Sequence, residues 1–128
     1  MDKIDSFRGE YKFLSNFYET PVKYNGLVYS NNEAAFQAQK SIDMRIRLVF
    51  TGMNAPSAKK HGRKILLRND WEQVKDTIMY EICLEKFKQN PELKQELLAT
   101  KDAHLEEGNC WGDKEWGTVN GVGKNKLG

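Results

Sequence analysis

The sequence predicts an α+β fold that is mostly α-helical, with a small N-terminal hairpin. Two strand-like runs joined by an Asn-Gly pair lie near the N-terminus, and apolar residues recur at helical spacing through the middle of the chain. Segments of strand character on both sides of a helical middle are typical of α+β folds. At 128 residues the chain has the length of one domain, so we expect a single domain spanning 1–128.

The N-terminal third is rich in aromatic residues and strand-like in character. The runs 21–24 and 27–29 flank Asn25-Gly26, and both central residues of a type I′ turn need positive φ. We therefore predict a hairpin here. Asn31 or Asn32 can then cap a helix from about 33 to 41.

Further helices are expected at 44–50, 58–64 and 71–89, the last with Asp70 as its cap. The longest of them should bury the apolar residues that recur near helical spacing, which are Trp71, Val74, Ile78, Ile82 and Phe87.

Asn90-Pro91 predicts the start of another helix, with Asn90 as its cap and Pro91 in the first turn. Its inward face should carry Leu93, Leu97 and Leu98. Residues 103–106 have the character of a strand, and the glycine-rich segment 108–128 is expected to be irregular loop.

Composition excludes several classes of protein. The 20 basic and 18 acidic side chains are interspersed, which is unlike the basic field of a general nucleic-acid binder. No apolar run reaches the roughly 20 residues that cross a bilayer, and the polar N-terminus is unlike a secretory signal. Cys83 and Cys110 are far apart, and His61 and His104 stand alone. We expect a cytoplasmic protein with reduced thiols, no metal, no cofactor and no membrane contact.

Three polar side chains of the predicted helix 33–41 share one face. Glu33, Gln37 and Lys40 are related by i, i+4 and i+7. A carboxylate in the first turn of a helix is favoured in its ionised form, and it could stabilise an oxocarbenium-like centre or deprotonate water. Lys40 could hold a phosphate or orient the carboxylate. A solvated face with an intrahelical Glu and Lys is the commoner meaning of this spacing.

The glycine-rich tail offers a second group of residues, namely Trp111, Gly112, Asp113, Trp116 and Asn125. Glycines let a backbone approach a ligand closely, and tryptophans present flat faces to a base. Asp113 supplies a second carboxylate, and two carboxylates flanking a ribosyl bond suit glycoside hydrolysis. The alternative is a glycine-rich turn region whose tryptophans fill the core.

Two weaker signals remain. Asn16 lies between aromatic residues and could bind a base edge or a ribose hydroxyl, although such a residue more often satisfies a turn. The basic run 59–64 is either a phosphate-binding segment or a charged helix face, and we favour the charged face. His61 within it is no credible nucleophile or ligand by itself.

Each of these segments is a weak signal alone, but their order and spacing together form a specific pattern. The blocks 7–18, 32–40, 58–63, 71–79, 86–87, 97–100 and 111–113 follow one another at compatible spacing. With them the chain resembles the NADAR family, which includes YbiA-like proteins, over essentially its whole length. The resemblance implies an α+β fold dominated by helices and an N-glycosidase that hydrolyses the C1′–N bond of a phosphorylated ribosyl compound.

Two substrate classes are associated with this family. One is the ribosylamino-pyrimidine phosphates of early riboflavin biosynthesis, and the other is ADP-ribose linked to guanine, including a nucleobase in nucleic acid. The resemblance implies catalytic roles for Glu33, Lys40 and Asp113. It implies substrate-binding roles for Arg8, as a phosphate contact, and for Asn16, Phe17, Phe36, Gln37, Trp111, Gly112, Trp116 and Asn125.

The chain departs from the family pattern at two places. Ala34-Ala35 stand where relatives carry a larger residue and an aromatic one, which could enlarge or reshape the pocket. Relatives also continue into a short apolar helix beyond the position of Gly128, so this helix is expected to be missing. Two other functions stay open, a non-catalytic ADP-ribose or nucleotide-binding module and an interaction protein built on the helix 71–89. We expect a monomer.

Overall fold

The computed structural model describes residues 3–101, 103–108, 113–119 and 121–128. Backbone contacts divide the chain into two compact units. One is Asn16–Pro91, and the other combines Met1–Ser15 with Glu92–Gly128. A single domain over the whole chain therefore stays a prediction.

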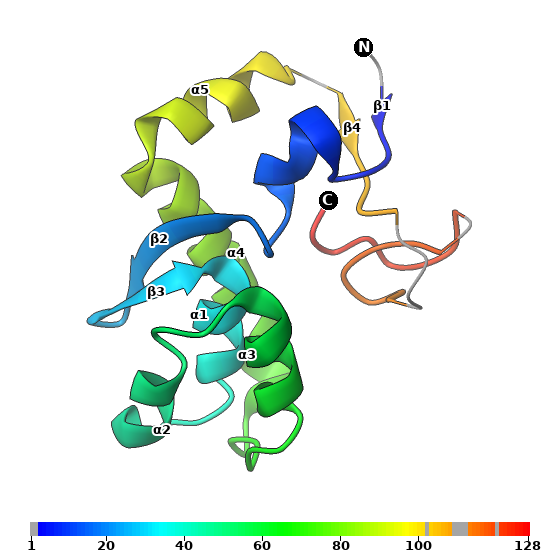
Figure 1. Cartoon of the computed structure of the whole chain (residues 1–128). Helices are drawn as coiled ribbons and strands as arrows, with labels where there is room; N and C mark the ends of the chain where they lie inside the picture. The colour runs from blue at the N-terminus through cyan, green and yellow to red at the C-terminus, as the bar shows by residue number, and fades with distance from the viewer. Residues whose placement is uncertain (1–2, 102, 109–112, 120) are drawn as a thin grey trace. The chain divides into compact units, whose positions relative to one another are not determined.

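The larger unit opens with the predicted hairpin, formed by the antiparallel strands β2 (Glu19–Tyr24) and β3 (Leu27–Asn31) (Figure 1). The residues between the strands, Asn25 and Gly26, have φ values of 48° and 87°. Both are positive, as a type I′ turn requires, so the hairpin prediction is confirmed. Alternate residues of β2 are buried, with Val22 fully inaccessible, and the hairpin thus presents one face to the core.

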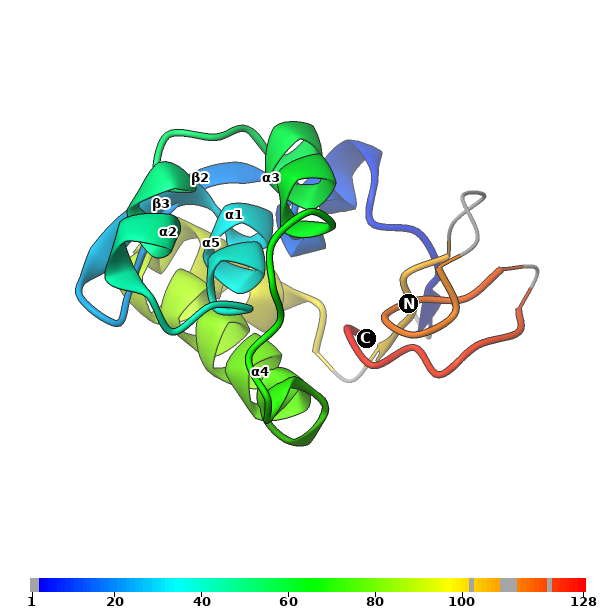
Figure 2. The ribbon, with the colours of Figure 1, turned by 90° about the horizontal axis from the view of Figure 1, so that it is seen from below.

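Four helices follow in the same unit. They are α1 (Asn32–Ala38), α2 (Met44–Val49), α3 (Ala55–Gly62) and α4 (Trp71–Gln89). Helix α1 is the central element, because it packs against both strands of the hairpin and against the other three helices (Figures 1 and 2). All seven of its residues are buried. The core of this unit is therefore built around α1.

Both ends of α1 are fixed by specific contacts. Asn31 caps its start, since the side-chain oxygen accepts a hydrogen bond from the Ala34 amide at 2.8 Å. The helix ends at Ala38, so the predicted end at residue 41 is wrong. The next amides bond three residues back, and the Lys40 carbonyl accepts from the Arg68 amide at 2.7 Å. This contact holds Lys40 in a tight turn after the helix.

The C-terminal end of α4 covers the edge of the hairpin. The Gln89 side chain accepts a hydrogen bond from the Lys23 amide at 2.8 Å and donates one to the Lys23 carbonyl at 2.9 Å. Nearer the middle of α4, the Tyr24 hydroxyl donates to Glu81 at 2.5 Å. The two bonds of Gln89 satisfy backbone groups that an open strand edge would leave exposed.

Helix α4 has the predicted bounds, but its capping differs from the prediction. The Asp70 carboxylate makes no cap bond, because it pairs with the Arg68 guanidinium at 2.6 Å. The Asn90 side chain is held between the Lys86 carbonyl at 2.6 Å and the Thr20 hydroxyl at 3.1 Å. Asn90 thus closes the end of α4.

The apolar face of α4 agrees in part with the prediction. Trp71, Ile78 and Ile82 are buried, whereas Val74 and Phe87 are only half-buried. Helix α3 begins at Ala55, earlier than predicted, because Asn54 accepts a cap bond from the Ser57 amide at 2.9 Å.

The smaller unit has two short parallel strands, β1 (Lys3–Ile4) and β4 (His104–Leu105). Strand β4 falls within the predicted 103–106. The aromatic segment expected to be strand-like instead contains a 3-10 helix, η1 (Gly9–Leu14), because Gly9 has a φ of 58° and turns the chain. That expectation was wrong.

Helix α5 (Pro91–Ala99) forms where the sequence predicts it. Its predicted inward face is only partly correct. Leu93 is buried and Leu97 half-buried, whereas Leu98 is 59% exposed.

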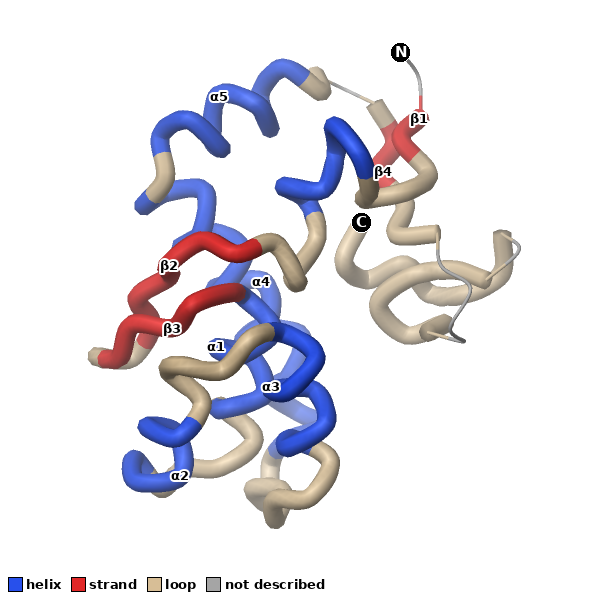
Figure 3. The backbone as a smooth tube through the Cα atoms, in the orientation of Figure 1, coloured by secondary structure: helices blue, strands red, loops and turns tan. Residues whose placement is uncertain are grey.

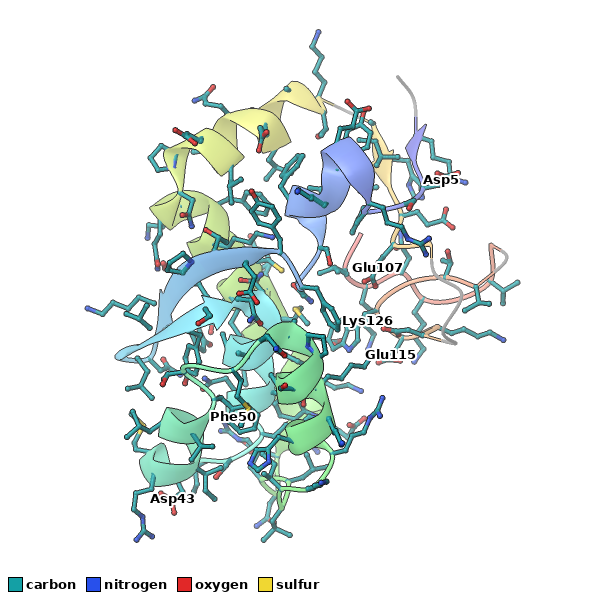
Figure 4. The ribbon with its side chains drawn as sticks, viewed as in Figure 1. Asp5, Asp43, Phe50, Glu107, Glu115 and Lys126 are labelled. Atoms are coloured by element: carbon teal, nitrogen blue, oxygen red, sulfur yellow. The ribbon has the colours of Figure 1, made fainter. Side chains whose placement is uncertain are left out.

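The described part of 108–128 contains isolated bridges and no named helix or strand (Figure 3). Asn125 ties this segment together, since its side chain accepts from the Glu107 amide at 2.9 Å and donates to the Leu105 carbonyl at 2.8 Å. Glu115 and Lys126, labelled in Figure 4, form an ion pair. The predicted irregular loop is thus confirmed for the described residues.

Across the described ranges, no helix is both long and apolar enough to cross a bilayer. The Cys83 thiol lies 3.9 Å from the Asn16 side-chain oxygen, and Cys110 lies outside the described residues.

The buried cap of α1 gives a first prediction. Replacing Asn31 with alanine removes the bond that its side-chain oxygen accepts from the Ala34 amide. It also removes the bond that its side-chain nitrogen donates to the Met53 carbonyl at 3.1 Å. We expect the free energy of unfolding in urea to fall by about 2 kcal/mol or more. The matched control is Asn54→Ala, which removes an exposed cap with a single bond and should cost about 1 kcal/mol or less. Equal losses in both variants would contradict the central role of α1.

Candidate functional site

Glu33 lies in the first turn of α1 and is 8% exposed. Its backbone amide donates to the Asn16 carbonyl at 3.1 Å, which fixes the start of the helix against the preceding loop. Its carboxylate accepts a hydrogen bond from the Gln37 side chain at 2.9 Å, one turn further on. The structure thus brings together two members of the predicted face and holds the carboxylate in one orientation.

Gln37 is itself buried, and α3 makes room for it at Gly62. A Cβ atom added at Gly62 would lie 2.0 Å from the Gln37 side-chain oxygen, far inside van der Waals contact. That oxygen has no hydrogen-bond partner among the described residues, so the single bond of the side chain is the one its nitrogen makes to Glu33. The glycine in α3 therefore lets Gln37 orient the carboxylate.

Lys40 is half-buried in the turn that follows α1. Burial lowers its pKa, and the neighbouring cations Arg63 and Lys59 lower it further, while the charge of Glu33 raises it. Lys40 therefore feels the charge of Glu33, but it lies in the turn after α1 and not on the predicted helical face. Its predicted catalytic role stays a prediction.

Lys59 and Arg63 belong to the basic run that the sequence left as either a phosphate-binding segment or a charged helix face, with the charged face favoured. Lys59 lies in α3 and Arg63 directly follows its last residue, Gly62, and both lower the pKa of Lys40. The Lys59 ammonium lies 5.9 Å from the centroid of the Phe17 ring, which is 42% exposed. The sequence showed only a basic run, and the packing of α3 against α1 shows which element it lies next to.

Two other predicted residues lie in the core beside this site. The Asn16 side chain accepts from the Asn32 amide at 3.2 Å and donates to the Met79 sulfur at 3.4 Å. The Phe36 ring is buried 5.1 Å from the ring of Trp71. Both side chains support the site from within, and their contact with a substrate stays a prediction.

The remaining predicted residues belong to the smaller unit. Arg8 is exposed just before η1. One Asp113 oxygen accepts from the amides of Glu115 and Trp116, at 3.1 and 3.0 Å, and closes a turn. The Trp116 ring lies 5.7 Å from the Lys126 ammonium.

The contacts of Asp113 and Asn125 within this unit are structural. The functional roles predicted for Arg8, Asp113, Trp116 and Asn125 are not tested by these contacts. Trp111 and Gly112 lie outside the described residues.

No three His, Cys, Asp or Glu side chains group as a metal site within the part of the chain that the structure describes. The His61 ring lies 5.1 Å from that of Phe50, which is fully buried and labelled in Figure 4. Ala34 and Ala35, where the family pattern has larger residues, are both fully buried in α1.

Chemically, the site combines a fixed buried carboxylate with nearby cations. Such a carboxylate can stabilise positive charge that develops on a bound molecule or accept a proton from water. The cations can hold an anionic group.

Comparison with known proteins assigns the family. The sequence matches the family model of the NADAR domain over residues 5–128. The chain belongs to the NADAR family. It is 38% identical over 126 residues to the N-glycosidase YbiA of Shigella boydii serotype 4, covering 93% of this chain and 76% of that protein. The N-glycosidase YbiA of Escherichia coli K12 is 37% identical with the same coverage.

A riboflavin biosynthesis protein of Vibrio vulnificus is 36% identical over 120 residues, which are 91% of this chain and 32% of that protein. The NMR structure of the Escherichia coli protein YbiA superposes with a TM-score of 0.84 at 36% identity. That match covers 98% of this chain and 76% of the other. The predicted NADAR membership and the mostly helical α+β fold are therefore confirmed.

The close approach at Gly62 can be tested directly. Gly62→Ala places a methyl group against the Gln37 side chain, and we expect it to cost about 1–3 kcal/mol of unfolding free energy in urea. Gly52→Ala is the matched control, since a Cβ there meets nothing within 4 Å and should change stability by about 1 kcal/mol or less. Shortening the opposing side chain in Gly62→Ala/Gln37→Ala should recover part of the loss. Identical behaviour of the two glycine variants would contradict the contact.

The charges around Lys40 predict opposite pKa changes. Removing the negative charge in Glu33→Gln should lower the Lys40 pKa further, whereas removing a positive charge in Arg63→Ala should raise it. NMR titration of the labelled lysine ammonium groups measures both changes. Lys60→Ala, on the exposed side of α3, should leave the value unaltered. A shift of the same sign in both site variants would show that these groups do not share an environment.

Proposed function

We propose that this chain is an N-glycosidase that hydrolyses the C1′–N bond of a phosphorylated ribosyl compound, with Glu33 as its catalytic carboxylate. The observation that carries the proposal is the buried Glu33 side chain, which Gln37 orients and whose charge raises the pKa of Lys40. The relatives named N-glycosidase support the class of reaction.

The proposed reaction is a dissociative hydrolysis. As the C1′–N bond lengthens, its electron pair leaves with the base and positive charge develops on the ribose. The Glu33 carboxylate stabilises that charge and takes a proton from the water that attacks C1′. The proton that Glu33 takes from water is returned, directly or through solvent, to the nitrogen of the departing base, and the free ribose phosphate or ADP-ribose is the second product. The bond from Gln37 holds the carboxylate in place, so little reorganisation is needed during the reaction.

Two substrate classes fit this chemistry, ribosylamino-pyrimidine phosphates and ADP-ribose linked to guanine. Both place a phosphate-bearing ribose on a nitrogen, and both therefore need a carboxylate near C1′ and cations near the phosphate. The similarity to a riboflavin biosynthesis protein favours the pyrimidine class.

The catalytic assignment predicts the outcome of one substitution. Glu33→Gln keeps the shape of the side chain and an acceptor for Gln37 but removes the charge. We expect release of base to fall by about 10²–10³ or more, with folding retained. Mass spectrometry of the products measures it, with both substrate classes offered in parallel to the wild type and the variant.

Glu72→Gln is the matched control, since Glu72 is an exposed residue of α4 that pairs with Lys75. It should release base at the wild-type rate. Near-normal turnover by Glu33→Gln would remove Glu33 from the mechanism. Tight binding of ADP-ribose by both proteins, with no product from either substrate, would instead identify a nucleotide-binding module.

A further inference from the structure

Helix α3 and the residue that follows it contribute two cations to the site that the proposed reaction does not yet use. We propose that Lys59 of α3 and Arg63, the residue that directly follows this helix, hold the phosphate group of the substrate together with Lys40. The three residues are called the cation cluster below. The inference rests on the proposed function and names the part of the molecule that recognises the phosphate.

The position of α3 directs the cluster toward Glu33. Gly62 lies against Gln37, the residue that binds the Glu33 carboxylate. Lys59 and Arg63 are three residues before and one residue after this glycine, so the backbone contact brings both close to the same end of α1. Their effect on Lys40 agrees with this placement.

Several cations of this unit pair with a carboxylate, whereas the cluster, like Lys23, Arg47, Lys60 and Lys64, forms no such pair within the described residues. Arg45, Arg68 and Lys75 each form an ion pair with a nearby carboxylate, which belongs to Asp43, Asp70 and Glu72 respectively.

At Lys40 the charge of Glu33 opposes the charges of Arg63 and Lys59, because it raises the pKa that they lower. Three positive charges against one negative charge leave an excess of two when Lys40 is protonated, which matches the charge of a phosphate monoester dianion or of a diphosphate linkage.

Lys59 is held near the site before any substrate binds. Its side chain is half-buried, and its ammonium lies over the exposed Phe17 ring at 5.9 Å from the centroid. A cation placed in this way has lost part of its freedom already, so less entropy is lost when it contacts an anion. Lys60, the next residue on α3, is exposed, whereas Lys59 is half-buried.

The first test measures binding without turnover. Ribose 5-phosphate, inorganic phosphate and unphosphorylated ribose are titrated into the wild type and into Lys59→Ala, Arg63→Ala and the matched control Lys60→Ala. Loss of one charged contact should weaken binding of ribose 5-phosphate and of phosphate by about tenfold, while Lys60→Ala binds as the wild type does. Circular dichroism checks that each variant is folded.

The second test separates binding from catalysis. In the product assay, Lys59→Ala and Arg63→Ala should raise KM by about tenfold and change kcat little, because they act on the phosphate and not on the C1′–N bond. ADP-ribose, offered beside ribose 5-phosphate as a competing ligand, distinguishes a diphosphate from a monoester as the group recognised.

Unaltered phosphate binding in folded Lys59→Ala and Arg63→Ala, or an equal loss in Lys60→Ala, would overturn the inference. The proposed function fails separately. If the wild type cleaves neither substrate and yet binds ribose 5-phosphate through the cluster, the phosphate site stands and the N-glycosidase proposal falls.

Discussion

The complete burial of α1 is the constraint on which the rest of the site depends. A helix of seven residues is too short to be stable by itself in water, so α1 exists because the hairpin and three helices surround it. The Asn31 side chain caps its start. Since Glu33 belongs to this helix, its position is set by the packing of the unit Asn16–Pro91 and not by a loop. A group on a rigid element can be placed more accurately against a reacting bond.

Burying a carboxylate has a cost that the surrounding residues must offset. An ionised group removed from water without compensation costs several kcal/mol. Here the Gln37 amide donates directly to Glu33, and the charge of Lys40 lies nearby. The missing side chain at Gly62 makes this arrangement possible, because a methyl group there would displace Gln37. The bond from Gln37, for which Gly62 leaves space, therefore both offsets the burial of the Glu33 carboxylate and fixes its orientation.

The features that could be predicted from the sequence are those that depend on interactions between residues close together in the chain. The Asn25-Gly26 turn and the bounds of α4 follow from backbone preferences and helical spacing, and the structure confirms both. The end of α1 could not be predicted, because it depends on the distant Arg68 amide that binds the Lys40 carbonyl. For Lys59, likewise, a basic run could not decide between a phosphate-binding segment and a charged helix face, because it does not show which residues lie opposite. The NADAR resemblance supplied the chemistry of Glu33, which spacing alone left open.

The central claim is that the reaction takes place at the carboxylate of α1. A crystal structure of the Glu33→Gln protein with an uncleaved ribosyl substrate tests it most directly. The account predicts that the C1′ carbon lies against the side chain of residue 33, with the phosphate toward α3. A substrate bound with its C1′ carbon out of reach of that side chain would contradict it.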